Sequence, residues 1–161
     1  MSYFKIRQRN KNKEKIEIVK VRLKYYGENL KLIDSLKSDI KDIEDSFDSI
    51  HSGWSDTDPT SGGSSCQEDI LVKSFDEIDS LVGEIEDIKK ADEDIRKAIK
   101  NLNDNMLQSI VFRLWVYDKY CKNHDTIRGI ALRYDLSKNM VWRKSDAALL
   151  SIYKSLYNDW N

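Results

Sequence analysis

Apolar residues recur every three or four positions between about Lys13 and Ile50. That spacing places them on one face of an α-helix, so a long amphipathic helix is predicted over 13–50. Gly27 interrupts the pattern, and we expect it to weaken the helix or to mark a bend. The positions on the apolar face are Ile16, Val19, Leu23, Tyr26, Leu30, Ile33, Ile40, Ile43 and Phe47.

Residues 51–67 break this periodicity with a proline, a glycine pair and several serines, which predicts a loop. A helical connection of this length favours either a functional or a disordered segment. Trp54 is the unusual member of the loop, because its apolar ring needs either a helix to dock on or a partner to bind.

A second long helix is predicted from about Gln67 to Asn101. Its first half has the alternating four and three spacing of a coiled-coil seam, at Leu71, Phe75, Ile78, Val82 and Ile85. The phase then shifts, and the stripe continues through Ile88, Ala91, Ile95, Ile99 and Leu102. Two long helices joined by one loop predict an antiparallel hairpin over 13–102, although a coiled coil between two chains would leave the same stripe.

A C-terminal module of three helices is predicted over 103–161. Asparagine and aspartate dominate 101–105, so one helix stops and another starts there. The new helix is expected from about Asp104 to Lys122, with an apolar face at Met106, Ile110, Leu114 and Tyr117. Two helices with a break at 135–137 follow, and the last extends toward Trp160. The predicted fold class is therefore all-α.

The break between the last two helices has the pattern of a helix-turn-helix. Ala131 is the small residue expected where the second helix crosses the first closely. Asp135 stands where glycine is usual, because that position adopts a left-handed conformation that aspartate tolerates better than most residues. Leu136 should enter the core and Ser137 should cap the second helix. Lys144 lies near the core, where an apolar residue is expected. The other inward positions are Ile127, Ile130, Tyr134, Val141 and Ala148.

Polar and basic residues are left on the outer face of the second helix. With Val141 inward, helical geometry turns Asn139 and Arg143 outward. In a helix-turn-helix this face enters the major groove of double-stranded DNA, where arginine can read guanine and asparagine can read adenine. The expected DNA contacts are Arg128, Arg133, Ser137, Lys138, Asn139, Trp142 and Arg143, of which Arg128, Arg133 and Lys138 are better placed for phosphates.

The net charge of −1 conceals a strong segregation along the chain. Residues 1–25 carry nine Lys/Arg against two Asp/Glu, residues 26–105 carry nine against twenty-one, and residues 106–161 carry nine against five. Local charge decides phosphate attraction, so the basic C-terminal part favours DNA binding. The basic residues 1–12 form either an arm for phosphates or a solvated helix start. The acidic middle is either a solvated face or a surface for a basic partner such as RNA polymerase.

Several classes of site are not expected. No apolar run is long enough to cross a bilayer, so no membrane span is predicted and a cytoplasmic protein is the default. No Gly-rich phosphate loop follows a strand, and no Cys/His or Ser/His/Asp arrangement stands out. We therefore expect no enzymatic activity, no cofactor and no metal. Cys66 and Cys121 should remain thiols in a reducing compartment.

The order of these elements, together with the stretch IRGIALRYDLSKNMVWRKSDAALL, resembles small phage-encoded transcriptional regulators of the ArpU/RinA type. Their C-terminal part is similar to sigma factor region 4, and they occur in phages and prophages of Gram-positive bacteria. Motif-level similarity covers 104–155, and Asp135 and Lys144 depart from the usual pattern. The resemblance implies control of late phage genes in the bacterial host cell. It implies DNA contacts by Ser137, Lys138, Asn139, Trp142 and Arg143.

Two other functions remain open. A small terminase-like packaging protein also joins a helix-turn-helix to coiled helices, although such proteins usually carry the DNA module first and assemble into rings. A coiled-coil adaptor would instead bind a protein partner through the hairpin, and its C-terminal helices would only pack. The hairpin is also a candidate surface for a homodimer.

Overall fold

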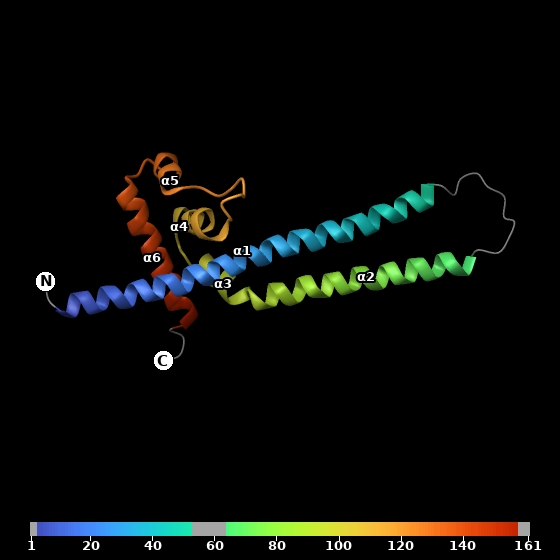
Figure 1. Ribbon diagram of the computed structural model, residues 1–161, viewed down its shortest axis with the longest axis horizontal. Coiled ribbons are helices and arrows are strands. Elements are labelled where there is room, and N and C mark those ends of the chain that lie inside the picture. Colours follow the sequence, from blue (N-terminus) through green and yellow to red (C-terminus); the bar gives the residue numbers. More distant parts are fainter. Residues whose placement is uncertain (1–2, 53–63, 158–161) are drawn as a thin grey trace. The chain divides into compact units, whose positions relative to one another are not determined.

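The computed structural model describes residues 3–52 and 64–157, with side chains for 10–47 and 69–157. All regular structure in these ranges is helical, which confirms the predicted all-α class. The α-helices are α1 (Tyr3–Ser52), α2 (Ser64–Ala91), α3 (Glu93–Lys100), α4 (Asn105–Val111), α5 (Ile127–Arg133) and α6 (Lys138–Tyr157), and a π-helical turn, η1 (Phe112–Val116), extends α4 (Figure 1). None of the described helices is apolar over a length that could span a membrane.

The chain divides into two compact units. Unit 1 contains Met1–Asn29 and Asp92–Asn161, and unit 2 contains Leu30–Ala91. The boundaries differ from the expected ones at 12 and 102, because the first part of α1 belongs with the C-terminal helices and only its second part belongs to the hairpin.

Unit 2 is an antiparallel helical hairpin in which the second part of α1 lies beside α2 (Figure 1). Its centre is formed by Ile33 and Leu36 of α1 and Ile85 of α2, with Ile40, Leu81 and Ile88 packed around them. The predicted seam is wrong at Val82, which is 41% exposed, whereas Phe75, although 58% exposed, stacks on Phe47 of α1 with ring centroids 5.4 Å apart. Leu81 takes the seam position that the pattern assigned to Val82, since two adjacent apolar residues satisfy the periodicity equally well.

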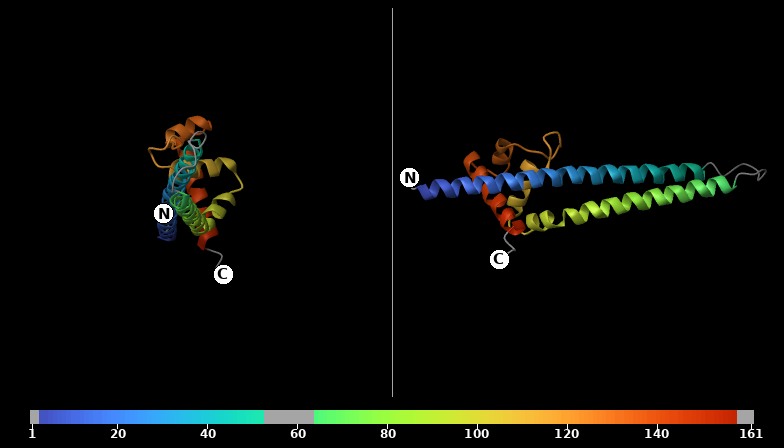
Figure 2. Two further views of the ribbon diagram at one scale, coloured as in Figure 1. Left: turned by 90° about the vertical axis from the view of Figure 1, so that its right-hand side faces the viewer. Right: turned by 60° about the horizontal axis from the view of Figure 1, so that its bottom comes forward.

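In unit 1, the first part of α1 packs against the helices that follow Asp92. Ile16, Val19, Leu23 and Tyr26 are all buried there. Helix α6 crosses this part of α1 (Figure 2), and the Lys15 ammonium lies 5.1 Å from the centre of the Tyr153 ring. The helix begins at Tyr3 and not near Lys13, so residues 3–12 continue it.

The second predicted helix is divided at Asp92, between α2 and α3. The Asp92 carboxylate is buried and accepts a hydrogen bond from the Asn29 amide at 2.8 Å. Nearby, the Arg22 guanidinium donates to both carboxylate oxygens of Asp94, at 3.0 and 3.2 Å. The break lies after the point at which the spacing of the apolar residues changes. That change in spacing is the sequence feature that indicates the end of one helix in this region.

The stop and restart near residue 102 is confirmed, because the Asp104 carboxylate caps α4 by accepting the N–H of Met106 at 2.8 Å. The predicted extent of the following helix, to Lys122, is wrong. It ends at Val116 after the π-helical turn, in which the N–H of Tyr117 donates to the carbonyl of Phe112 at 2.9 Å. Tyr117 itself is extended, so the chain leaves the helix six residues early.

Gly27 lies inside the continuous helix α1, where α1 closely approaches the backbone of Val116 in η1. A Cβ added at this position would collide with the carbonyl oxygen of Val116 and lie 3.0 Å from its carbonyl carbon. Glycine is therefore required by packing between two helices. The sequence predicted that Gly27 weakens the helix or marks a bend, and the chain is helical on both sides of it.

Candidate nucleic-acid interface

Helices α5 and α6 are joined by a left-handed turn at Asp135. Its φ is 51°, the one positive value among the described residues other than glycine. The N–H of Leu136 donates to the carbonyl of Ala131 at 2.9 Å, which is the long hydrogen bond of a Schellman motif. Aspartate thus occupies the position at which glycine is usual, as the sequence predicted.

Hydroxyl groups define where both helices begin. Thr126 caps α5, because its side chain accepts the N–H of Gly129 at 3.1 Å. The Ser137 hydroxyl accepts the N–H of Met140 at 3.2 Å, which confirms its expected role as the cap of α6. The first turn of α6 therefore starts at Lys138, directly after the left-handed turn.

Helices α4, α5 and α6 share a small apolar core. Ile110, Ile130, Ala131 and Val141 form its buried centre, and the residues packed around them are Met106, Leu114, Ile127, Tyr134 and Leu136. Tyr134 also donates its hydroxyl proton to the Ser109 hydroxyl at 2.8 Å. The inward positions predicted for the helix-turn-helix are therefore confirmed, and Lys144 is partly buried beside them.

The structure brings five predicted contact residues together at the start of α6. Ser137, Lys138, Asn139 and Arg143 are exposed, and Trp142 is 44% exposed. The two remaining arginines lie on α5. Arg128 is exposed, whereas the Arg133 Nε lies 3.5 Å from a carboxylate oxygen of Asp125. This surface is polar and basic, with one aromatic ring at its edge.

Trp142 belongs to a series of side-chain contacts that the sequence did not predict. Its ring centroid lies 6.4 Å from that of Trp115 in η1, and the Lys20 ammonium of α1 lies 4.5 Å from the centre of the Trp115 ring. The Trp115 indole N–H donates to the hydroxyl of Ser145 at 2.9 Å. Ser145 is fully buried in α6, so this bond satisfies a hydroxyl that would otherwise be unpaired. The presence of Ser145 on the apolar face of α6 is the sequence feature that could have indicated a buried hydrogen bond at this position.

The two units carry net charges of opposite sign. Unit 1 contains 21 Lys/Arg and 12 Asp/Glu, a net charge of +9, whereas unit 2 contains 6 and 16, a net charge of −10. The sequence already predicted that charge is unevenly distributed along the chain, and the division into units gives a larger difference in net charge than the sequence ranges did. The basic residues near the N-terminus and those near the C-terminus belong to the same compact body.

Ionisable groups inside unit 1 are few. Burial, and secondarily the Asp92 carboxylate, raises the pKa of Tyr26 above its ordinary value.

In the part of the chain with described side chains, no group of three or more His, Cys, Asp or Glu could hold a metal ion. Cys121 is a free, partly buried thiol. Trp54 and the side chain of Cys66 lie outside the described residues.

Comparison with known proteins does not identify this chain. No family model matches it, and neither does a characterised protein or a solved structure. The features of the chain that bear on function are therefore the geometry of α5 and α6 and the charge of unit 1.

Proposed function

We propose that unit 1 binds double-stranded DNA through the first turns of α6 and that the chain regulates transcription. The supporting observation is the exposed set of polar and basic side chains on α6, held by a capped helix and a Schellman turn against α5. Recognition helices of this motif approach base edges with their N-terminal residues. The net charge of +9 on unit 1 supplies the attraction to phosphates that such binding needs.

The chemistry of each side chain suggests its role. Arg143 can donate two parallel hydrogen bonds to guanine, and Asn139 can pair with the edge of adenine. Ser137 and Lys138, together with Arg128 on α5, suit phosphate oxygens. Trp142 can contact a thymine methyl group. Binding of Arg133 to a phosphate would require it to exchange its contact with Asp125 for the phosphate oxygen.

Unit 2 is a candidate for recruiting a protein. Its net charge of −10 makes DNA an unfavourable ligand and also opposes close pairing of two hairpins. The exposed apolar side chains Val72 and Val82 on α2 lie near the exposed acids Asp76 and Asp79 in the sequence of the helix. This surface suits a basic protein partner, for which host RNA polymerase is our proposal. Control of phage late genes in a bacterial cytoplasm stays a prediction from the resemblance.

Binding of the full chain to fluorescently labelled duplex DNA tests the proposal, with anisotropy measured across a series of salt concentrations. Affinity should fall steeply with salt. Arg143→Ala should weaken binding to a preferred sequence by about tenfold, and Lys138→Ala should weaken binding to all sequences and lower the salt slope by about one. Lys97→Ala removes the same charge from α3 and serves as the matched control. Absence of salt-dependent DNA binding would contradict the proposal.

A further inference from the structure

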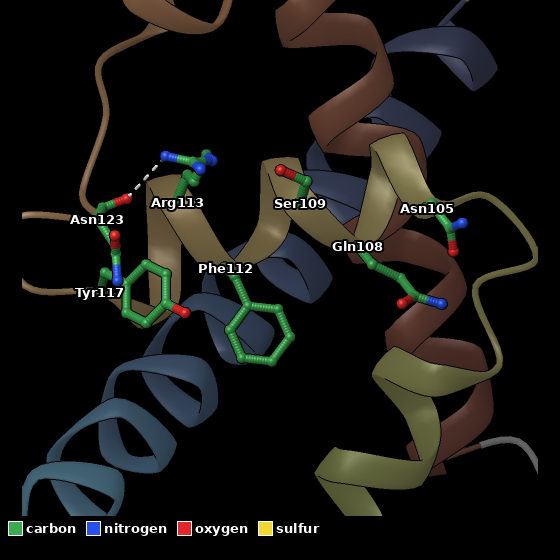
Figure 3. A pocket seen from close by; sticks show the side chains of 7 residues that line it. All are labelled: Asn105, Gln108, Ser109, Phe112, Arg113, Tyr117 and Asn123. Carbon is green, nitrogen blue, oxygen red and sulfur yellow. Dashed lines mark hydrogen bonds between the residues drawn. The ribbon is translucent and has the colours of Figure 1, made fainter.

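A cleft of about 450 Å³ lies in unit 1, on α4, η1 and the segment that follows them (Figure 3). Its volume falls within the range of about 300–1,000 Å³ that is typical of small-molecule sites. The lining residues are Asn105, Gln108, Ser109, Phe112, Arg113, Tyr117 and Asn123. None of them belongs to α6 or to the proposed DNA contacts, so the cleft is a separate feature.

The cleft is rich in hydrogen-bond donors and has no carboxylate in its lining. Arg113 is partly buried and donates one N–H to the carbonyl of Asn123 at 3.3 Å. It forms no ion pair within the described part of the chain, so most of its donors remain available. The Ser109 hydroxyl accepts a hydrogen bond from the Tyr134 hydroxyl and can itself donate one. A planar guanidinium among neutral donors suits an acceptor-rich anion such as phosphate.

Two aromatic rings complete the lining. Phe112 and Tyr117 have ring centroids 5.8 Å apart at an interplanar angle of 41°. Figure 3 shows these rings next to each other, with the Gln108 side chain on the other side of Phe112. The Gln108 amide N–H₂ is held by the carbonyl of Leu102 at 2.7 Å, so its oxygen remains as an acceptor. Aromatic faces can stack on any nucleobase, and the neighbouring amide can form a hydrogen bond with the edge of the base.

We propose that this cleft binds a nucleotide, with its phosphate at Arg113 and its base against Phe112 and Tyr117. Two sources share this chemistry, a free nucleotide and a nucleotide within a single strand. The site also touches the segment before α5, because the backbone carbonyl of Arg113 accepts the N–H of Asp125 at 3.0 Å. The proposal does not depend on duplex binding by α6, and it can be tested without duplex DNA.

Titration calorimetry of the full chain tests it with three probes: AMP, inorganic phosphate and a single-stranded hexanucleotide. AMP should bind saturably at one site, and inorganic phosphate should bind at least about tenfold more weakly, because it lacks a base that can stack on the aromatic rings. Hexanucleotide binding that is tighter than AMP binding and depends on Arg113 assigns the site to a strand, and equal or weaker binding assigns it to free nucleotides. Failure of both AMP and hexanucleotide to bind overturns the proposal, as does phosphate binding as tight as AMP binding.

Substitutions then locate the binding. Arg113→Gln should weaken AMP binding by about tenfold or more, since a charge-assisted hydrogen bond is lost. Asn105→Asp places a carboxylate beside the cleft and should also weaken binding, while acid in the first turn of α4 suits the helix dipole and preserves the fold. Lys119→Gln removes an exposed cation outside the lining and should leave binding unchanged. AMP affinity unaltered by both Arg113→Gln and Asn105→Asp would contradict the assignment.

Discussion

Two glycines inside long helices should respond in opposite directions to the same substitution. Glycine in a helix interior costs roughly 1 kcal/mol relative to alanine, so helix propensity alone predicts that Gly27→Ala and Gly83→Ala both stabilise. At Gly83 an added Cβ meets nothing within 4 Å, and the full gain of about 1 kcal/mol is expected. At Gly27 the same atom would collide with the backbone carbonyl of Val116.

The collision at Gly27 is costly because the obstacle is backbone and not the end of a flexible side chain. Relief requires α1 and η1 to separate, which disturbs the packing of the buried neighbours Leu23 and Tyr26. Overpacking of this kind typically costs about 1–3 kcal/mol, and occasionally more. After the gain of about 1 kcal/mol in helix propensity, we expect Gly27→Ala to lower the free energy of unfolding by up to about 2 kcal/mol.

Urea denaturation followed by far-ultraviolet circular dichroism measures both variants against the unsubstituted chain, and calorimetry assigns each change to a transition. Gly83→Ala is the matched control, since it makes the same chemical change in an unobstructed helix. Stabilisation by Gly27→Ala equal to that by Gly83→Ala would refute the close approach of α1 to η1, and with it the place of α1 in unit 1.

Three further features of unit 1 can be tested by substitution. Asp135→Gly should raise the free energy of unfolding by about 0.5 kcal/mol and Asp135→Ala should lower it by about 1 kcal/mol, since a positive φ strains a residue with a Cβ; equal midpoints in chemical denaturation would argue against the left-handed turn. Trp115→Phe should lower the free energy of unfolding by about 1 kcal/mol, because it leaves the buried Ser145 hydroxyl without this hydrogen bond. Adding Ser145→Ala should recover part of that free energy, and a double-mutant cycle without coupling would exclude the hydrogen bond. Burial raises the pKa of Tyr26, so the folded chain keeps this proton to higher pH than the unfolded chain, and the resulting stability is lost as pH rises beyond about 10 through the raised pKa. Tyr26→Phe should therefore reduce the loss of stability at alkaline pH, whereas Tyr25→Phe, at an exposed neighbour, should not; identical alkaline melting curves would count against this assignment.

The turn between α5 and α6 could be predicted from sequence because its determinants are local. Asp135, Leu136 and Ser137 act through hydrogen bonds that reach at most five residues along the chain. The order of a small residue, a residue that tolerates a left-handed conformation and a capping residue can therefore be recognised in the sequence itself. The inward residues of the same module followed from helical periodicity, and their common core confirms them.

The partner of each apolar face was not predictable, because periodicity identifies a face but not what covers it. Leu23 and Ile33 lie on one stripe of α1, yet the first is buried in unit 1 and the second in unit 2. The end of the helix at Val116 has a similar cause. Residues up to 122 are compatible with a helix, and the close contact of Val116 with Gly27 joins positions far apart in the sequence.

The cleft around Arg113 could not be predicted from the sequence either. Its residues come from α4, η1 and the non-helical segment after them, and a single helix to Lys122 would have placed Tyr117 and Asn123 elsewhere. Where the chain leaves the helix decides which side chains face one another. The contact of Trp115 with Ser145 depends likewise on two separate helical elements.

Selection of bound fragments from a random duplex library, followed by sequencing, tests the central proposal most directly. The full chain should enrich a short motif, and Arg143→Ala should remove the preference at a guanine position while leaving the other positions in place. Asn139→Ala should act in the same way on an adenine position. Recovery of no motif, or of a motif that neither substitution changes, would contradict base recognition by α6.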